Sequence, residues 1–166
     1  MTLLKTLPSK GNYTLIIQLN AKTRLKMPKL GCFTLQKGYY AYTGSALGDG
    51  ATSLTKRIAR HLKKRKTRFW HIDFLLSNKN AKITAVVGAE TRLNQECKIN
   101  DLIKNIEEAT LPASGFGASD CKQNCRSHLV HLGDACCHEK IVDVYTRLFR
   151  NEPFSMFTGP ALNSEG

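Results

Sequence analysis

An arginine and a histidine stand four residues apart in the segment LTKRIARHL, which covers residues 54–62. Side chains at this spacing project from one face of a helix, over neighbouring turns. A guanidinium offers paired donors to phosphate oxygens, and an imidazole can accept or release a proton near neutral pH. Arg57 and His61 therefore have the chemistry of a phosphate site, although a solvated basic helix would carry the same pair.

A helix over residues 52–64 is the element that must position this pair. Thr52 or Ser53 can accept the free amide hydrogens at its start, and apolar residues recur at every fourth position as a buried stripe. Residues 56–68, which run from this helix into the segment after it, carry eight cations in thirteen residues, a density suited to tracking a phosphate backbone. Besides Arg57, we predict nucleic-acid contacts from Lys56, Arg60, Lys63, Lys64, Arg65, Lys66 and Arg68.

The whole chain is strongly basic. Its 25 Lys and Arg residues outnumber 13 Asp and Glu residues, which gives a formal net charge of +12 and a pI near 9.6. Such a surface attracts polyanions, with nucleic acid ahead of anionic membrane. No stretch is apolar and long enough for a membrane helix, and the first residues lack the features of an export signal. We therefore expect a cytoplasmic protein whose six cysteines are reduced.

The apolar pattern predicts one α+β domain over residues 1–157 and a flexible tail at 158–166. A stretch at residues 25–35 is interrupted by Pro28 and Gly31, as a hairpin would be. The other strands are expected at 13–19, 39–43, 83–87 and 127–132, and the other helices at 69–76, 93–106 and 141–149.

The expected helix at 93–106 carries one carboxylate of interest. Its apolar spacing runs through Leu93, Cys97, Leu102, Ile103 and Ile106. Because Cys97 falls on this stripe, the neighbouring residue Glu96 should point in another direction, away from the core.

Two tyrosine and glycine elements flank the first strands. The tripeptide GNY at residues 11–13 opens the first strand, and YTG at residues 42–44 ends a strand just ahead of the helix with Arg57 and His61. This arrangement resembles the signature of the GIY-YIG nuclease superfamily. Both tyrosines and both glycines match, while each middle isoleucine is replaced.

Further segments resemble one branch of that superfamily, the Uri-like endonucleases, also described as domain of unknown function 123. They stand in that branch's order over residues 11–132, as GYYAYTGSA at 38–46, WHID at 70–73, EC at 96–97 and GFGASDC at 115–121. The resemblance implies an α+β fold with a small central, mostly antiparallel three-stranded sheet flanked by helices. An extra N-terminal hairpin insertion and a C-terminal extension would complete it.

The resemblance also implies an activity, the metal-dependent hydrolysis of phosphodiester bonds in DNA, possible substrates being single-stranded or branched. The site would consist of Tyr13, Tyr42, Arg57, His61 and Glu96. Glu96 would bind Mg²⁺ or Mn²⁺, and Arg57 would clamp the scissile phosphate. Tyr42 and His61 would orient water or phosphate, with His61 also able to protonate a leaving group.

Tyr13 is the base that the resemblance implies for the attacking water. A phenol titrates near pH 10, so this role requires the metal and Arg57 to lower its pKa, or a relay for its proton. The neighbouring aromatic residues Tyr39 and Tyr40 we interpret as packing. His71 and Asp73 could support the site, but the apolar residues around them favour a structural role.

Two other functions fit the same sequence. The chain could bind nucleic acid without efficient catalysis, because its charge suits both activities. It could also be a zinc-stabilised protein that binds RNA or a protein partner. Cys121, Cys125, His128 and His131 have spacings that a zinc site can use, and residues 136–138 could contribute.

Overall fold

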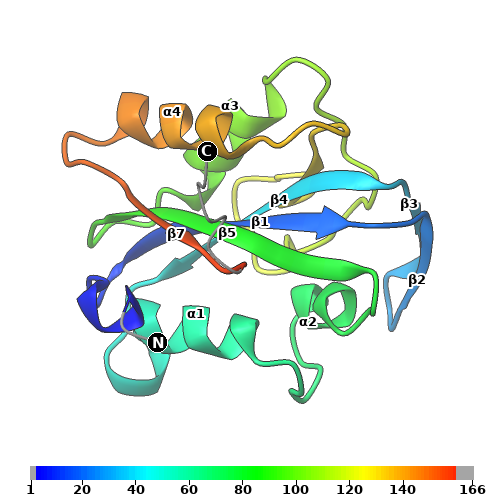
Figure 1. The fold of residues 1–166 in the computed structure, drawn as a ribbon, viewed down its shortest axis with the longest axis horizontal. Coiled ribbons are helices and arrows are strands. Elements are labelled where there is room, and N and C mark those ends of the chain that lie inside the picture. Colours follow the sequence, from blue (N-terminus) through cyan, green and yellow to red (C-terminus); the bar gives the residue numbers. More distant parts are fainter. Residues whose placement is uncertain (1–2, 160–166) are drawn as a thin grey trace, which may run out of the picture.

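The computed structural model describes residues 3–159 as a three-layer arrangement, in which a central sheet separates two pairs of helices (Figure 1). The sheet has five antiparallel strands in the order β6-β4-β1-β5-β7. Their bounds are β1 Gly11–Leu19, β4 Gly38–Ala46, β5 Ala81–Glu90, β6 Leu129–His131 and β7 Phe154–Phe157. A separate two-stranded sheet joins β2 Thr23–Met27 to β3 Gly31–Leu35.

The central strand β1 is paired along its whole length, with β4 on one side and β5 on the other. Its side chains alternate between the two faces, as strand geometry requires. Tyr13, Leu15 and Ile17 join the core beneath one pair of helices, and Ile16 joins the core beneath the other. Burial on both faces explains why YTLIIQL reads as an almost continuous apolar run.

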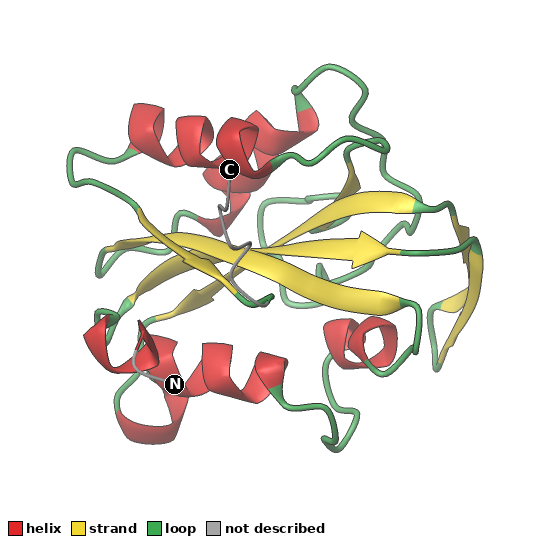
Figure 2. Ribbon diagram, viewed as in Figure 1, coloured by secondary structure: helices red, strands yellow, loops and turns green. Residues whose placement is uncertain are grey.

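Helices cover both faces of the sheet (Figure 2). On one face lie α1 Leu54–Leu62 and α2 His71–Leu76, and on the other lie α3 Glu96–Lys104 and α4 His138–Leu148. Short 3-10 turns span Leu3–Thr6 and Gly50–Thr52. Ser53 caps α1, since its hydroxyl oxygen accepts the Lys56 amide hydrogen at 3.4 Å.

The expected three-stranded sheet is wrong in size. β6 pairs with the outer edge of β4 over three residues, and β7 pairs with the outer edge of β5 over four. Sequence patterns predicted a strand around β6, where the apolar run SHLVHL at 127–132 is longer than the strand itself, but none at β7, whose four residues FSMF are too few to show clear alternation. The expected hairpin insertion is present as β2 and β3.

The residue after β7 extends the pairing of β7 with β5 by one backbone hydrogen bond. The Thr158 amide donates to the Thr84 carbonyl oxygen at 3.1 Å. Most of the predicted tail, residues 160–166, lies outside the described residues.

The predicted apolar stripe of α3 is right only for its last members, Ile103, which is buried, and Ile106, which packs against the core just beyond the helix. The buried residues of this helix are Ile99, Asn100 and Ile103, whereas Leu93 lies before the helix with 64% of its surface exposed and Leu102 is 37% exposed. The helix begins only at Glu96, so the spacing counted from Leu93 does not describe one helical face. Cys97 is half-buried and faces a group of sulfur and nitrogen atoms described below.

Within residues 3–159, none of the helices has the length and apolar character needed to span a lipid bilayer.

Candidate active site

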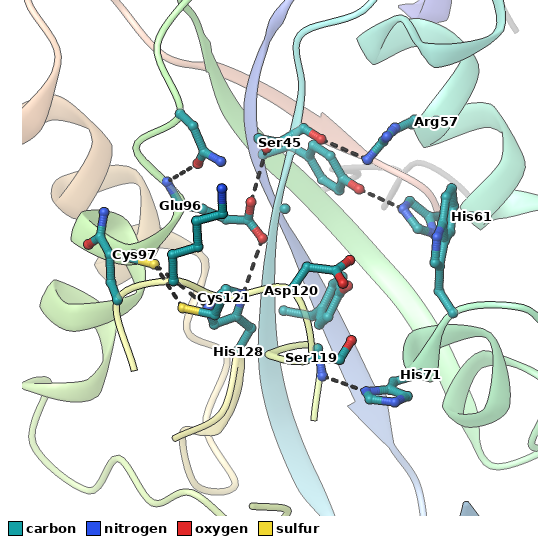
Figure 3. A pocket seen from close by; sticks show the side chains of 18 of the residues that line it. Ser45, Arg57, His61, His71, Glu96, Cys97, Ser119, Asp120, Cys121 and His128 are labelled. Carbon is teal, nitrogen blue, oxygen red and sulfur yellow. Dashed lines mark hydrogen bonds and ion pairs between the residues drawn. The ribbon is translucent and has the colours of Figure 1, made fainter. Parts of the chain in front are cut away.

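One cavity of about 590 Å³ collects all five residues that the resemblance singled out (Figure 3). Tyr13 comes from β1, Tyr42 from β4, Arg57 and His61 from α1, and Glu96 from the start of α3. The loop that precedes β6 forms the remaining wall, and Trp70 and His71 line the cavity from the start of α2. The fold thus brings these side chains together from four separate elements.

The cavity lies where β4 loses its outer neighbour. β6 pairs with β4 from Tyr40 to Tyr42, and toward the C-terminal end of β4 the last hydrogen bond joins the Thr43 amide to the His128 carbonyl oxygen at 3.4 Å. Beyond that point Ser45 lines the cavity. Side chains from the helices on both faces of the sheet can therefore meet at the end of β4, where the strand has no outer neighbour.

Ser45 connects the two charged residues of the site. Its hydroxyl donates to Glu96 Oε2 at 3.0 Å, and its carbonyl oxygen accepts from Arg57 Nη1 at 2.9 Å. The Arg57 guanidinium also lies over the Trp70 ring, 5.2 Å from the ring centre, a cation–π distance. Arg57 and Glu96 are thus held on opposite sides of one serine without forming an ion pair with each other.

Tyr13 and His61 form a buried pair, with 2.7 Å between Tyr13 Oη and His61 Nε2. Burial raises the pKa of Tyr13 above its ordinary value, and the nearby Arg57 charge only partly offsets this. Burial, helped by the Lys66 charge, lowers the pKa of His61 to about 3. Both groups are therefore neutral at pH 7, and a neutral imidazole with its proton on Nδ1 can accept the Tyr13 hydroxyl proton at Nε2.

Neutral His61 argues against one expected role, that of protonating a leaving group, because this would require an imidazolium at working pH. Tyr42 is also disfavoured as an anion, since burial raises its pKa well above the usual value. Its ring meets Phe116 edge-on, with 6.1 Å between ring centres.

Two glycines leave room for the tyrosines. Gly44 faces Tyr13 across the strand pair, and a Cβ atom there would lie 2.7 Å from Tyr13 Oη. Gly117 has a φ of +68°, and a Cβ atom there would lie 2.8 Å from the Tyr42 ring. Both contacts are too close for any other residue, so the glycine of the YTG element has a steric reason.

The WHID segment has mainly the expected structural role. Asp73 is fully buried, accepts two hydrogen bonds of 2.8 Å from the Arg60 guanidinium, and also accepts the amide hydrogens of Phe69 and Trp70. Although burial opposes ionisation, the Arg60 hydrogen bond and these amides hold the pKa of Asp73 below its usual value. His71 Nδ1 accepts the Gly117 amide at 2.8 Å and so ties the far loop to α2.

The seven cations predicted to touch nucleic acid divide into two groups. In the first group the charged ends have partners within the protein: Arg60 forms an ion pair with Asp73, and the Lys66 ammonium donates to the His61 carbonyl oxygen. The others are exposed, namely Lys56, Lys63, Lys64, Arg65 and Arg68. These five exposed side chains remain available to contact a phosphate backbone.

The group of cysteine and histidine residues that could bind zinc differs by one member from the group expected from the sequence. Cys121, Cys125 and His128 lie together, but the fourth member of the group is Cys97 from α3. His131 instead lies at the Lys37 carbonyl oxygen, 3.2 Å away, and packs on Tyr40. No second group of this kind occurs within residues 3–159, so residues 136–138 do not contribute.

The cavity wall formed by the loop before β6 also has titratable groups with shifted pKa values, Cys121 and His128. Burial raises the pKa of Cys121, but the amides of Cys125 and Gln123 and the neighbouring thiols outweigh it and bring the pKa to about 6. Burial lowers the pKa of His128, but the Glu96 carboxylate 3.1 Å from Nδ1 outweighs it, so the net shift is upward.

Sequence reasoning missed several residues of the cavity, three of which bear directly on its chemistry. Ser45 follows the YTG element directly, and Asp120 stands in the GFGASDC segment, so both lay within motifs that had been recognised. Phe69 lies at the cavity with 78% of its surface exposed, whereas the sequence places it only at the start of the apolar run that is expected to form a helix at 69–76.

A protein-family model described as "Domain of unknown function DUF123" matches residues 12–150. The chain belongs to this family. The DUF123 match includes every residue of the cavity named above, from Tyr13 to His128. Comparison with the curated proteins found no match, and comparison with the solved structures found none either.

Proposed function

We propose that the chain is a divalent-metal-dependent phosphodiesterase of the GIY-YIG type that cleaves nucleic acid, DNA in the first place. One observation carries this proposal: Tyr13, Tyr42, Arg57, His61 and Glu96 line one cavity. These residues come from four separate helices and strands, and five residues chosen at random from such elements would not be expected to meet in one cavity.

Arg57 is suited to hold the scissile phosphate. The Ser45 carbonyl oxygen and the Trp70 ring fix the plane of its guanidinium, which has further N–H donors for phosphate oxygens. A clamp oriented in advance reduces the entropy lost when substrate binds and stabilises charge that develops on the phosphoryl group.

Tyr13 and His61 provide a route for the proton of the attacking water. As the water oxygen bonds to phosphorus and the bond to the leaving oxygen breaks, the water proton passes to Tyr13 Oη. The hydroxyl proton of Tyr13 passes at the same time to His61 Nε2, 2.7 Å away. This relay avoids a free phenolate, which the raised pKa of Tyr13 makes unfavourable. The low pKa of His61 also disfavours the imidazolium that the relay forms, so the negative charge of the bound phosphate is required to stabilise that cation.

The donor set of the cavity fits a hard divalent cation. Glu96 offers carboxylate oxygens whose present partners, Ser45 and His128, leave lone pairs free. Asp120 brings a second carboxylate into the same cavity. Mg²⁺ and Mn²⁺ prefer such oxygen ligands, and a bound cation supplies Lewis-acid stabilisation of the phosphoryl and leaving oxygens.

The surface beside the cavity suits a single strand. The exposed cations after α1 offer a salt-sensitive path for phosphates, and Phe69 offers an exposed ring on which a base can stack. These features carry no pattern for reading particular bases, so we expect selection by strand flexibility or shape.

Incubation with labelled single-stranded, duplex and branched DNA, and with matching RNA, in Mg²⁺, Mn²⁺ or EDTA tests the proposal. Wild type should cleave at least one substrate in a metal-dependent way, and Glu96→Gln should lose at least a hundredfold in rate. Glu139→Gln is the matched control, because Glu139 also stands in the first turn of a helix but is exposed on α4. Absence of cleavage on every substrate, or equal rates for wild type and Glu96→Gln, would overturn the assignment.

A binding module without efficient catalysis is the second candidate. It is favoured by the burial of Tyr13, which is only 2% exposed and has a raised pKa. Tight, salt-dependent binding to DNA without cleavage in any metal would support this candidate in place of the enzyme.

A further inference from the structure

Four side chains with soft or borderline donor atoms converge beside the cavity. Cys97 comes from α3, Cys121 and Cys125 come from the loop before β6, and His128 directly precedes that strand. Their ligand atoms all lie within 4.8 Å of one another. Cys97 Sγ is 3.5 Å from Cys121 Sγ and 4.0 Å from His128 Nε2.

These separations are close to those of a tetrahedral site. With zinc–sulfur bonds of about 2.3 Å and zinc–nitrogen bonds of about 2.0 Å, two sulfur ligands stand roughly 3.8 Å apart and a sulfur and a nitrogen ligand roughly 3.5 Å apart. The sulfur–sulfur separation of 3.5 Å is slightly shorter than this and the sulfur–nitrogen separation of 4.0 Å is somewhat longer, so small adjustments of the side chains would close the site around the ion. Three thiolates and one imidazole form a closed donor set that zinc favours, whereas Mg²⁺ and Mn²⁺ prefer oxygen.

A disulfide would explain the group less well. A bond between Cys97 and Cys121 would use two of the three thiols and leave Cys125 and His128 without a purpose at the same point. Convergence of four donors from two segments of the chain points to a common ligand at their centre.

The loop itself requires a source of order. Between the end of α3 at Lys104 and the start of β6 at Leu129, the chain forms turns but no helix or strand. Phe116 and Ala113 are buried anchors, but no side chain from 119 to 126 is buried. A loop of this length with so little buried surface is seldom ordered by packing alone, and a metal that binds both Cys121 and Cys125 would hold it.

His128 also connects this group to Glu96. Its Nδ1 lies 3.1 Å from Glu96 Oε1, while its Nε2 faces Cys97. Histidines that bind zinc commonly donate their other ring N–H to a carboxylate, which fixes the tautomer and the ring orientation. The carboxylate is oriented in return, and Glu96 is in addition the covalent neighbour of Cys97.

We propose that Cys97, Cys121, Cys125 and His128 bind one structural zinc ion, and that this site positions the Glu96 carboxylate through His128. The zinc site stands independently of the proposed function. Only its consequence for cleavage rests on the role of Glu96 in the phosphodiesterase. Glu96 is then shared between two metals of different chemistry, as an outer partner of zinc and as an oxygen ligand of a hard cation.

Metal analysis of the full chain, purified from zinc-containing medium without chelators, tests the first half of the proposal. We expect about one zinc per chain in wild type and a loss of most of it in Cys97→Ser and Cys121→Ser. Cys136→Ser is the matched control, because Cys136 is exposed and lies outside the group. Zinc retained by all variants, or absent from wild type, would overturn the site.

Cobalt exchange of wild type keeps the test decisive if the cysteine variants fail to fold. Co²⁺ in this site should give intense visible absorption of tetrahedral type together with thiolate-to-cobalt charge transfer. Weak absorption typical of six oxygen ligands, or a Cys97–Cys121 disulfide in protein kept under reducing conditions, would exclude the thiolate site.

Chelator competition tests the link to Glu96 without any nuclease assay. Glu96→Gln should weaken zinc binding at least about tenfold, as loss of an outer carboxylate partner does, and Glu139→Gln should leave it unchanged. Equal zinc affinity for wild type and Glu96→Gln would refute the positioning role while leaving the zinc site and the phosphodiesterase as separate questions.

Discussion

Burial of neutral His61 makes a quantitative prediction about stability in acid. The imidazole is 3% exposed, and its pKa is lowered to about 3 from an ordinary value near 6.5. As pH falls below 6.5, the unfolded chain takes up a proton at this residue while the folded chain does not. The contribution of His61 to stability is therefore complete above about pH 6.5 and is lost as pH falls toward 3.

The size of the effect follows from the pKa difference. Each pH unit in this window removes at most about 1.4 kcal/mol from the free energy of unfolding. Between pH 7 and pH 5 the loss from His61 alone should be about 2 kcal/mol, since titration of the unfolded residue only begins near 6.5. The variant His61→Gln has no titrating group at this position and should lack this component.

Urea unfolding of wild type and His61→Gln at pH 7 and pH 5 measures the difference. All other titrating groups are shared by the two proteins, so their contributions cancel when the two pH dependences are subtracted. Wild type should lose about 2 kcal/mol more than the variant over this interval. Parallel pH dependences would mean that His61 is not held neutral, and the proposed proton relay from Tyr13 would lose its acceptor.

Other predictions concern the shape and surface of the site. Gly44→Ala should displace the Tyr13 ring, cost roughly 1–3 kcal/mol in urea unfolding and abolish cleavage, whereas Gly159→Ala, with open space around its Cβ, should change neither. Phe69→Ala should weaken binding of single-stranded DNA by roughly 1–3 kcal/mol in fluorescence anisotropy, and an unchanged affinity would remove the stacking role. Phe157→Ala is its control, being exposed outside the cavity. Affinity should also fall steeply with salt, and a flat titration would contradict backbone tracking.

The elements with strong local patterns were predictable from the sequence. The segment 13–19 lies within β1, and the predicted helix at 52–64 contains α1 with the expected capping residue and two fully buried residues of its stripe, Leu54 and Ile58. In both cases hydrophobic period and turn chemistry agree with the packing that the fold imposes. The five residues of the resemblance could also be named in advance as members of one site, because the resemblance implied this, but the contacts that hold them there, such as those of Ser45, could not.

Contacts between distant segments could not be predicted. Arg60 has the same character as its basic neighbours in sequence, and only the fold reveals that it is paired with a buried aspartate. Cys97 fitted a helical stripe counted from Leu93, but the helix starts later and turns this thiol toward Cys121. Long-range partners of this kind depend on tertiary geometry, for which a single sequence has no local signal.

The two walls of the cavity differ in what keeps them rigid. Tyr13 stands on a strand that is hydrogen-bonded on both sides, and its backbone amide should resist hydrogen exchange almost as long as the whole fold survives. The opposite wall from 119 to 126 has no buried side chain, so without the proposed zinc ion it could open locally at far lower cost. Removal of that metal should therefore change the shape of the entrance, while the sheet that carries the reactive residues stays fixed.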